Sequence, residues 1–253
     1  MVHFVGAGPG AADLITIRGR KLLEECDVLI YAGSLVNPEF INYCKKECEV
    51  HNSAYLNLEQ VIDIMKKADD EGKTVVRLHT GDPSIYGAIR EQMDELTRLG
   101  ISFDDTPGVS SFCGAAASLN LEYTLPGISQ SVIITRMEGR TKVPPKESVE
   151  ELASHDSTMV FFLSAGDIKG LTDRLIKAGR PGDTPCAVVY KATWPDEKKI
   201  VSTLSDIAEL AQKEGISKTT LIIVGDVVKS SEYEKSKLYD KDFETGFRNN
   251  CQE

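Results

Sequence analysis

The sequence has few of the features that mark secreted or membrane proteins. No apolar run approaches the roughly 18 residues that a membrane-spanning helix needs. Met1 leads directly into a strand-like segment, without the basic and apolar regions of a signal peptide. With only six cysteines in 253 residues, a disulfide framework is not needed for folding. We therefore expect a cytoplasmic protein without a membrane segment.

Positive charge is also scarce, since 29 Lys and Arg face 39 Asp and Glu, for a net charge of −10. Nucleic acids and anionic membranes attract broadly basic surfaces, so we predict neither as a partner. Cys44 and Cys48 could share a helix face, but they lack the CxxC spacing and histidine partners of a zinc site, and we predict no metal. The GxSxG, HExxH and GxxxxGK[ST] motifs are missing, which argues against serine hydrolases, zinc proteases and P-loop enzymes.

The chain does contain a regular alternation of strand-like and helical segments. The strands expected in the first half are Val2–Val5, Val28–Tyr31, Glu49–His51, Thr74–His79 and Ile101–Asp104. One helix is expected to begin after Asn57, with Gln60 completing a capping box, and to stop at Gly72. Another is expected over 86–99. This alternation predicts an α/β domain with a largely parallel sheet.

The second half repeats the alternation. Its expected strands are Ser131–Arg136, Thr158–Leu163, Cys186–Tyr190, Ile200–Thr203 and Thr220–Gly225, with helices at Lys146–His155, Ile168–Ala178 and Ser205–Lys213. The turn Pro195–Lys198 between two short strands predicts a hairpin and hence a mixed sheet. We predict two α/β domains, at 1–118 and 131–228, joined by a linker at 119–130 and followed by a charged tail at 229–253.

A glycine-rich turn, Gly6–Ala11, directly follows the first expected strand and fits the GxGxxG/A pattern of dinucleotide-binding loops. Pro9 removes one N–H from that loop. The acid expected after the second strand is also missing, because Ala32-Gly33-Ser34 stands there. These departures argue against an NAD(P) oxidoreductase.

Two further turns follow expected strands. Asp82 and Pro83 suit the start of a helix, or Asp82 meets an ammonium group of a ligand. In the other turn, Ser110 suits the cap of a short helix rich in small residues. Because the carboxyl ends of parallel strands lie at one edge of a sheet, the three turns are expected to converge on a single crevice.

Together these motifs resemble the tetrapyrrole methylase family. The likeness covers almost all of residues 1–228 and is carried by Val5–Gly10, Asp13–Gly19, Gly81–Pro83 and Pro107–Ser111. It implies an S-adenosyl-L-methionine-dependent C-methyltransferase with two α/β domains, usually a homodimer, that binds its cofactor between the domains. The segments Tyr31–Pro38, Thr135–Thr141 and Tyr190–Pro195 resemble the branch that methylates carbon 11 of cobalt-precorrin-4 or precorrin-4 in cobalamin biosynthesis.

The resemblance also implies a set of binding residues. Cofactor contacts are implied for Pro9, Thr80, Gly81, Asp82, Ile85, Ser110, Ser111, Leu163, Ala192 and Thr220, and substrate contacts for Gly8, Ser34, Arg136 and Arg140. Arg136 and Arg140 belong to a basic stretch that suits a polyanionic tetrapyrrole. No catalytic base is assigned; Asp104, Asp105 or solvent are candidates for accepting the substrate proton.

Other methylases of the same fold remain alternatives, namely uroporphyrinogen-III or other precorrin methyltransferases, diphthine synthase and ribosomal-RNA methylases. The uroporphyrinogen-III enzymes carry an Asp after the second strand, where this chain has Ala32-Gly33-Ser34. A binding module without catalysis is a further alternative.

Overall fold

The structure, a computed structural model, describes residues 1–240 and 243–244. It divides into two compact units, one formed by Met1–Ser118 with Lys191–Lys198, the other by Leu119–Tyr190 with the chain from Lys199 onward. The stretch 119–130, expected as a linker, belongs to the second unit. Two hydrogen bonds hold it there: Thr158 N donates to Ser129 Oγ (3.1 Å) and Thr158 Oγ1 to the Tyr123 carbonyl (3.1 Å).

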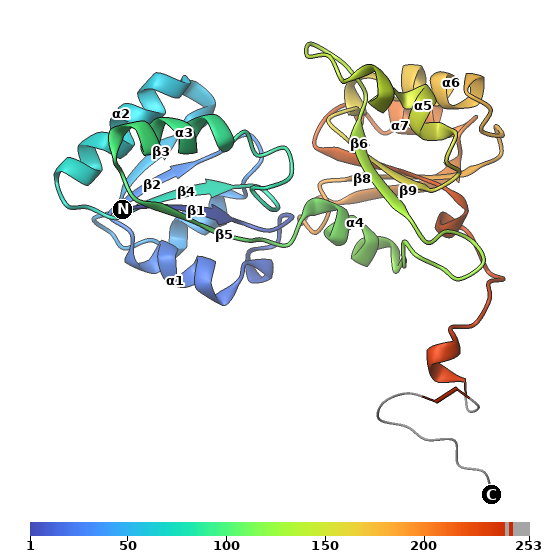
Figure 1. The fold of residues 1–253 in the computed structure, drawn as a ribbon, viewed down its shortest axis with the longest axis horizontal. Helices are drawn as coiled ribbons and strands as arrows, with labels where there is room; N and C mark the ends of the chain where they lie inside the picture. Colours follow the sequence, from blue (N-terminus) through green and yellow to red (C-terminus); the bar gives the residue numbers. More distant parts are fainter. Residues whose placement is uncertain (241–242, 245–253) are drawn as a thin grey trace, which may run out of the picture. The chain divides into compact units, whose positions relative to one another are not determined.

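The first unit contains a five-stranded sheet in which every neighbouring pair is parallel. Its strands are β1 (Val2–Gly6), β2 (Val28–Tyr31), β3 (Glu49–Asn52), β4 (Val75–His79) and β5 (Phe103–Thr106), in the order β3-β2-β4-β1-β5. Helices α2 (Leu58–Asp70) and α3 (Arg90–Leu99) cover one face, and α1 (Ile17–Glu25) covers the other (Figure 1). Helix α4 (Ser111–Leu119) follows β5. The predicted parallel α/β sheet is confirmed.

Local sequence explains where these helices begin and end. Asn57 and Gln60 form the expected capping box at the start of α2. Helix α3 ends at Gly100, which has a φ of +71°. The prediction that this helix starts at Tyr86 is wrong, because Tyr86 and Ala88 have positive φ angles of 56° and 50° that interrupt a helix.

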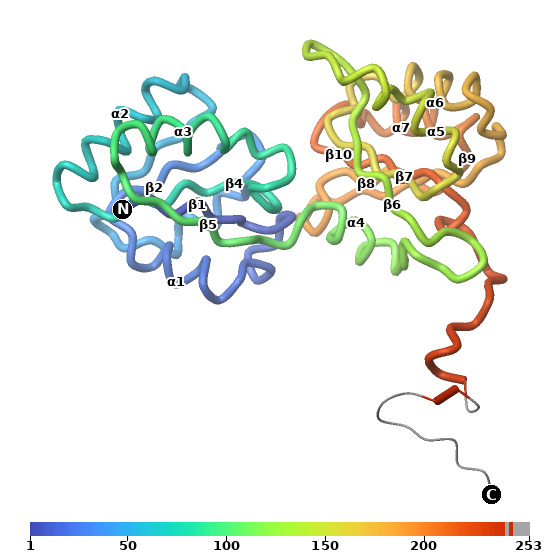
Figure 2. The backbone as a smooth tube through the Cα atoms, in the orientation of Figure 1, coloured from blue at the N-terminus to red at the C-terminus, as the bar shows by residue number. Residues whose placement is uncertain are grey.

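The second unit contains a mixed sheet, as predicted. Its strands are β6 (Val132–Arg136), β7 (Thr158–Phe162), β8 (Pro185–Tyr190), β9 (Lys198–Thr203) and β10 (Thr220–Val224), in the order β6-β7-β10-β8-β9. Strand β10 runs antiparallel to β7 and β8, whereas β6 and β7 are parallel (Figure 2). Helices α5 (Val149–Ala153), α6 (Ile168–Lys177) and α7 (Ile207–Lys213) pack on one core with this sheet.

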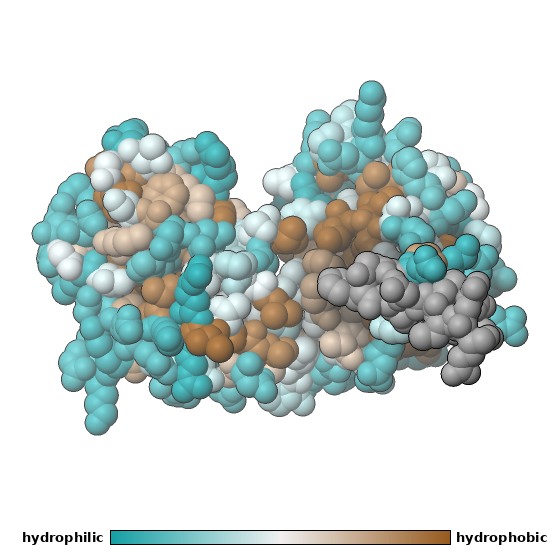
Figure 3. All heavy atoms as spheres, turned by 60° about the horizontal axis from the view of Figure 1, so that its bottom comes forward, coloured by the Kyte–Doolittle hydropathy of each residue, from teal (hydrophilic) through white to brown (hydrophobic). Residues whose placement is uncertain are grey.

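The surface carries hydrophilic side chains over most of the face shown in Figure 3, with apolar side chains in patches between them. Among the described residues, no helix has the length and apolarity that a membrane crossing requires. The expected tail at 229–253 lies partly outside the described residues. Its described part contains the short 3₁₀ helix Lys237–Tyr239.

Candidate functional site

The three glycine-containing turns of the first unit meet at the carboxyl ends of its strands, as expected. Gly8 and Gly81 form an antiparallel bridge, with N–H···O distances of 3.2 Å from Gly8 and 2.8 Å from Gly81. The N–H of Ala7 donates to the His79 carbonyl at 2.8 Å. The first and second turns are therefore joined through their backbones.

Glycine is required where the third turn approaches the other two. A Cβ on Gly6 would lie 2.5 Å from the Gly108 nitrogen, and one on Gly108 would lie 2.2 Å from the Gly81 carbonyl oxygen. Real Cβ atoms do not tolerate such contacts with a backbone that is itself held in place. Glycines at these positions therefore permit the close packing of the three turns.

Asp82 links the second turn to the third. Its Oδ1 accepts the N–H of Ser84 at 2.9 Å and also the Ser84 hydroxyl, and its Oδ2 accepts the N–H of Gly108 at 3.0 Å. The expectation that Asp82 caps a helix is wrong, since the residues after it form a turn and α3 begins only at Arg90. A carboxylate has about four acceptor positions, so Asp82 keeps room for about one ligand donor.

The third turn positions two hydroxyl residues. Ser110 is buried, and its carbonyl accepts the N–H groups of Cys113 (3.0 Å) and Gly114 (3.2 Å) in the first turn of α4. Ser111, the first residue of α4, is half-buried next to Gly81, whose Cβ position is 3.3 Å from Ser111 Oγ. Both residues thus lie beside the second turn.

The glycine-rich first turn is covered rather than open to a phosphate. Trp194 packs over Gly10, and its Nε1 donates to the Pro9 carbonyl at 3.1 Å. The N–H of Ala11 donates to Thr193 Oγ1 at 3.0 Å. Together with Pro9, which has no N–H, these contacts leave little of the donor array that a pyrophosphate needs. The structure therefore supports the argument against dinucleotide binding.

Strained backbone accompanies several of the predicted binding residues. Lys191 and Thr193, on either side of the buried Ala192, have φ angles of +48° and +69°. In the second unit, Leu163 has a φ of +52° and a side chain that is 69% exposed, directly after β7. Such conformations cost about 1–3 kcal/mol each and cluster at ligand sites. The strain is thus consistent with a binding role for these segments.

The remaining predicted residues of the second unit lie at strand ends or in the loop after β6. Thr220, which begins β10, is buried, and its hydroxyl donates to the Lys218 carbonyl at 2.6 Å. Arg136 ends β6, and its guanidinium donates to the carbonyls of Thr141 (3.2 Å) and Lys142 (2.9 Å). Arg140, in the same loop, is exposed. We expected the guanidinium N–H groups of Arg136 to bind a substrate carboxylate. In this structure they bind the carbonyls of the basic loop.

A cavity of about 260 Å³ in the first unit is lined in part by residues that the sequence motifs did not indicate. It lies next to the second turn, and the predicted residues Thr80 and Ile85 are part of its wall, whereas Ser34 is exposed outside it. Arg77 and His79, both about 95% buried on β4, also line it. The only signal in the sequence was an arginine within an otherwise apolar strand.

The electrostatics of this cavity are unusual. Arg77 donates to Gln92 Oε1 (3.1 Å) and to the Ile30 carbonyl (3.3 Å), and no ion pair involves it among the described residues. Burial lowers the pKa of Arg77 to about 10, so the side chain stays cationic at neutral pH. Burial and the Arg77 charge lower the pKa of His79 to about 3, and its Nε2 has no described hydrogen-bond partner. Glu91 also lines the cavity without a described ion pair to Arg77, so the cavity presents a buried positive charge beside an exposed carboxylate.

Two acids were candidates for accepting the substrate proton. Asp104 pairs with His3, with 2.7 Å between its Oδ1 and Nδ1 of the ring. Burial, and secondarily the charge of Asp82, raise the pKa of Asp105. A raised pKa makes a carboxylate a stronger base, which favours Asp105 over the ion-paired Asp104 as a proton acceptor.

Comparisons with known proteins agree with this geometry. The family described as "Tetrapyrrole (Corrin/Porphyrin) Methylases" matches residues 1–208. The chain is 58% identical over 247 residues to a cobalt-precorrin-4 C(11)-methyltransferase of Methanocaldococcus jannaschii, covering 98% of this chain and 95% of that relative.

Solved structures give the same result. A cobalt precorrin-4 methyltransferase superposes with a TM-score of 0.88 at 45% identity, over 90% of this chain and 96% of that one. A uroporphyrin-III C-methyltransferase from Thermus thermophilus, complexed with S-adenosyl homocysteine, superposes with a TM-score of 0.76 at 25% identity, over 90% of this chain and 98% of that one.

Proposed function

The chain belongs to the tetrapyrrole methylases, and on that premise we propose that it transfers a methyl group from S-adenosyl-L-methionine to carbon 11 of cobalt-precorrin-4 in cobalamin biosynthesis. The observation that carries the proposal is the 58% identity to a cobalt-precorrin-4 C(11)-methyltransferase over 98% of this chain. Uroporphyrinogen-III is disfavoured as the substrate, because Ala32-Gly33-Ser34 stands where the enzymes of that branch carry an Asp.

The methyl donor is proposed because the family consists of methylases and one structural neighbour is complexed with S-adenosyl homocysteine. When bound, the donor supplies an activated sulfonium methyl group. In the first unit the proposed contacts are Thr80, Gly81, Asp82, Ile85, Ser110 and Ser111 in the second and third turns, with Pro9 and Ala192 beside them. In the second unit they are Leu163 and Thr220.

The features of the first unit fit such a ligand. The joined turns form a rigid edge, and Asp82 keeps acceptor capacity toward a ligand ammonium group. Methyl transfer to an electron-rich carbon needs alignment and exclusion of water more than a strong base. Alignment alone can contribute on the order of 7–11 kcal/mol. We propose that these turns supply alignment and that Asp105 or solvent accepts the proton lost from the substrate.

The substrate carries acetate and propionate groups, so cationic side chains are its natural partners. The Arg77 cavity is proposed to take one of these carboxylates, because the buried guanidinium forms no ion pair among the described residues and the cavity has room for a small group beside the exposed Glu91. Gly8 and Ser34 remain proposed contacts from the resemblance, as do Arg136 and Arg140.

Arg136→Ala is expected to raise KM for the tetrapyrrole with little change in donor affinity. Unchanged KM would exclude that role.

The deciding experiment follows the transferred carbon. The protein is incubated with S-adenosylmethionine labelled on the methyl group and with either cobalt-precorrin-4 or metal-free precorrin-4, and the label is located by NMR. We expect labelling at carbon 11, faster with the cobalt-containing substrate. Label on another carbon, or no transfer to either substrate despite donor binding by calorimetry, would contradict the proposal.

The homodimer and the cytoplasmic location remain predictions. Sedimentation measurements test the homodimer.

A further inference from the structure

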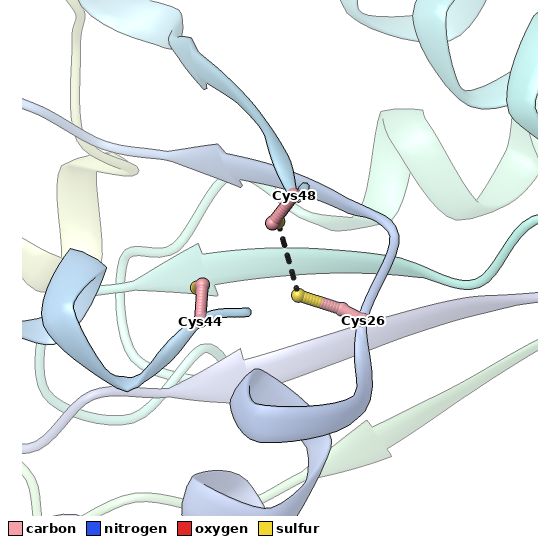
Figure 4. A group of neighbouring side chains, drawn as sticks. All are labelled: Cys26, Cys44 and Cys48. Atoms are coloured by element: carbon pink, nitrogen blue, oxygen red, sulfur yellow. Dashed lines mark hydrogen bonds between the residues drawn. The ribbon is translucent and has the colours of Figure 1, made fainter. Parts of the chain in front are cut away.

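Three cysteines that are distant in sequence gather at one edge of the first unit. Cys26 follows α1, Cys44 follows the 3₁₀ helix η2 (Pro38–Tyr43), and Cys48 directly precedes β3. Their Sγ atoms all lie within 4.8 Å of one another, and those of Cys26 and Cys48 are 3.6 Å apart (Figure 4). Cys44 and Cys48 do not share a helix, although their spacing would have allowed it.

The arrangement suits a thiophilic metal ion. Zinc binds thiolates at about 2.3 Å in tetrahedral geometry, which places neighbouring sulfurs about 3.8 Å apart. The 3.6 Å between the sulfurs of Cys26 and Cys48 is close to that value, and the other two separations are at most 4.8 Å. Cys26 is fully buried, whereas Cys44 and Cys48 are half-buried, which leaves an entry path from solvent. No second group of three His, Cys, Asp or Glu with this proximity occurs in the described part of the chain.

We propose that Cys26, Cys44 and Cys48 form a three-thiolate site for a thiophilic divalent metal ion, with Zn²⁺ as the test ion. Three metal–sulfur bonds form, the thiol protons pass to solvent, and water takes the fourth position. No electron transfer is involved. The ion would fasten the η2–β3 connection to the α1–β2 connection.

The proposed metal site is separate from the methyl-transfer site. Cys26 and Cys48 precede the strands β2 and β3, whereas the glycine turns follow β1, β4 and β5. In a parallel sheet the strand starts and the strand ends lie at opposite edges. The proposal therefore does not depend on the proposed substrate, and its failure would leave the methyltransferase assignment untouched.

Cobalt substitution provides the test, because tetrahedral Co²⁺ thiolates absorb strongly in the near ultraviolet and in the red. Reduced full-length protein is titrated with Co²⁺ without oxygen, and Zn²⁺ is then added to displace it. We expect one ion per chain with thiolate charge-transfer bands. Cys26→Ser, Cys44→Ser and Cys48→Ser should each lose these bands, and Cys113→Ser, which changes an exposed cysteine outside the cluster, should keep them.

A second measurement uses the unaltered chain, in case a variant fails to fold. Saturating Zn²⁺ should protect Cys44 and Cys48 from alkylation, read by peptide mass spectrometry, while Cys113 reacts equally with and without metal. It should also raise Tm by roughly 5–10 °C at a hundredfold excess over Kd. Substoichiometric binding, bands that survive in the cluster variants, or equal alkylation of all three cysteines would overturn the proposal.

Discussion

The two edges of the first unit's sheet differ in how closely their backbones approach. At the carboxyl edge, a Cβ on Gly108 would lie 2.2 Å from the Gly81 carbonyl oxygen, and the Asp82 carboxylate also joins these two turns. At the amino edge, the N–H of Asp27 donates to the Thr74 carbonyl at 2.9 Å, and Asp27 Oδ2 accepts the N–H of Thr74 at 2.8 Å. We therefore expect the carboxyl edge to tolerate substitution less than the amino edge.

The largest expected effect comes from glycine substitutions at the two edges. Gly108→Ala should destabilise the protein by at least about 3 kcal/mol, because its Cβ would overlap the backbone of two neighbouring turns. Gly72→Ala, between α2 and β4, should cost only about 1–2 kcal/mol, because its Cβ meets open space and only its positive φ opposes the change. Urea unfolding measures both. An equal loss in the free energy of unfolding for both variants would contradict the difference between the two edges.

Asp82 and Asp27 provide the next comparison. Asp82→Ala should cost about 2–3 kcal/mol and weaken donor binding, because both turns lose a charged acceptor of their N–H groups. Asp27→Ala should cost about half as much and leave donor binding unchanged, because it releases one N–H at the other edge. Unfolding and calorimetric titration of both variants measure this. A loss of donor affinity in Asp27→Ala would argue against separate roles for the edges.

The buried histidine at the carboxyl edge predicts a pH dependence. The pKa of His79 is lowered from 6.5 to about 3, so between these values the unfolded chain binds a proton that the folded chain does not. Stability should therefore fall as pH drops below 6.5, by up to about 1.4 kcal/mol per pH unit from this residue. His79→Gln should reduce that slope, whereas the exposed His155→Gln should not. Unfolding at several pH values checks this, and identical slopes would contradict it.

The smallest effect is expected for the exposed ion pair at the amino edge. Lys45 and Asp27 are each more than one-third exposed, so solvent screens their attraction. Lys45→Gln should change stability by less than about 1 kcal/mol. Thermal unfolding at low and high salt measures it, and a larger loss would mean that the amino edge depends on this pair.

Much of the fold followed from local sequence. The capping residues at Asn57 and Gln60, the stop at Gly100 and the apolar strands placed most elements within a few residues. The helix expected from Tyr86 begins only at Arg90, because positive φ angles at Tyr86 and Ala88 interrupt it. The expected 119–130 linker differs from the structure for a similar reason, because Thr158 binds that stretch through contacts across the unit.

The candidate site also has some features that local sequence predicts and others that it does not. The glycine turns were visible as motifs, and their convergence followed from the geometry of parallel strands. The Arg77 cavity and the cysteine cluster were not visible, because each depends on residues from separate segments. The cover that Trp194 forms over Gly10 joins positions 184 residues apart and has no local signal.

The order of residues alone was enough to establish an α/β chain with an acidic surface, three turns at strand ends, and a family resemblance, because periodicity, capping and glycine preferences act over a few neighbouring residues. The burial of Arg77 outside any described ion pair, the altered pKa of His79 and the meeting of three thiols emerged only when the chain was folded. Those properties depend on desolvation and on distances between atoms from different segments, and a linear sequence contains neither.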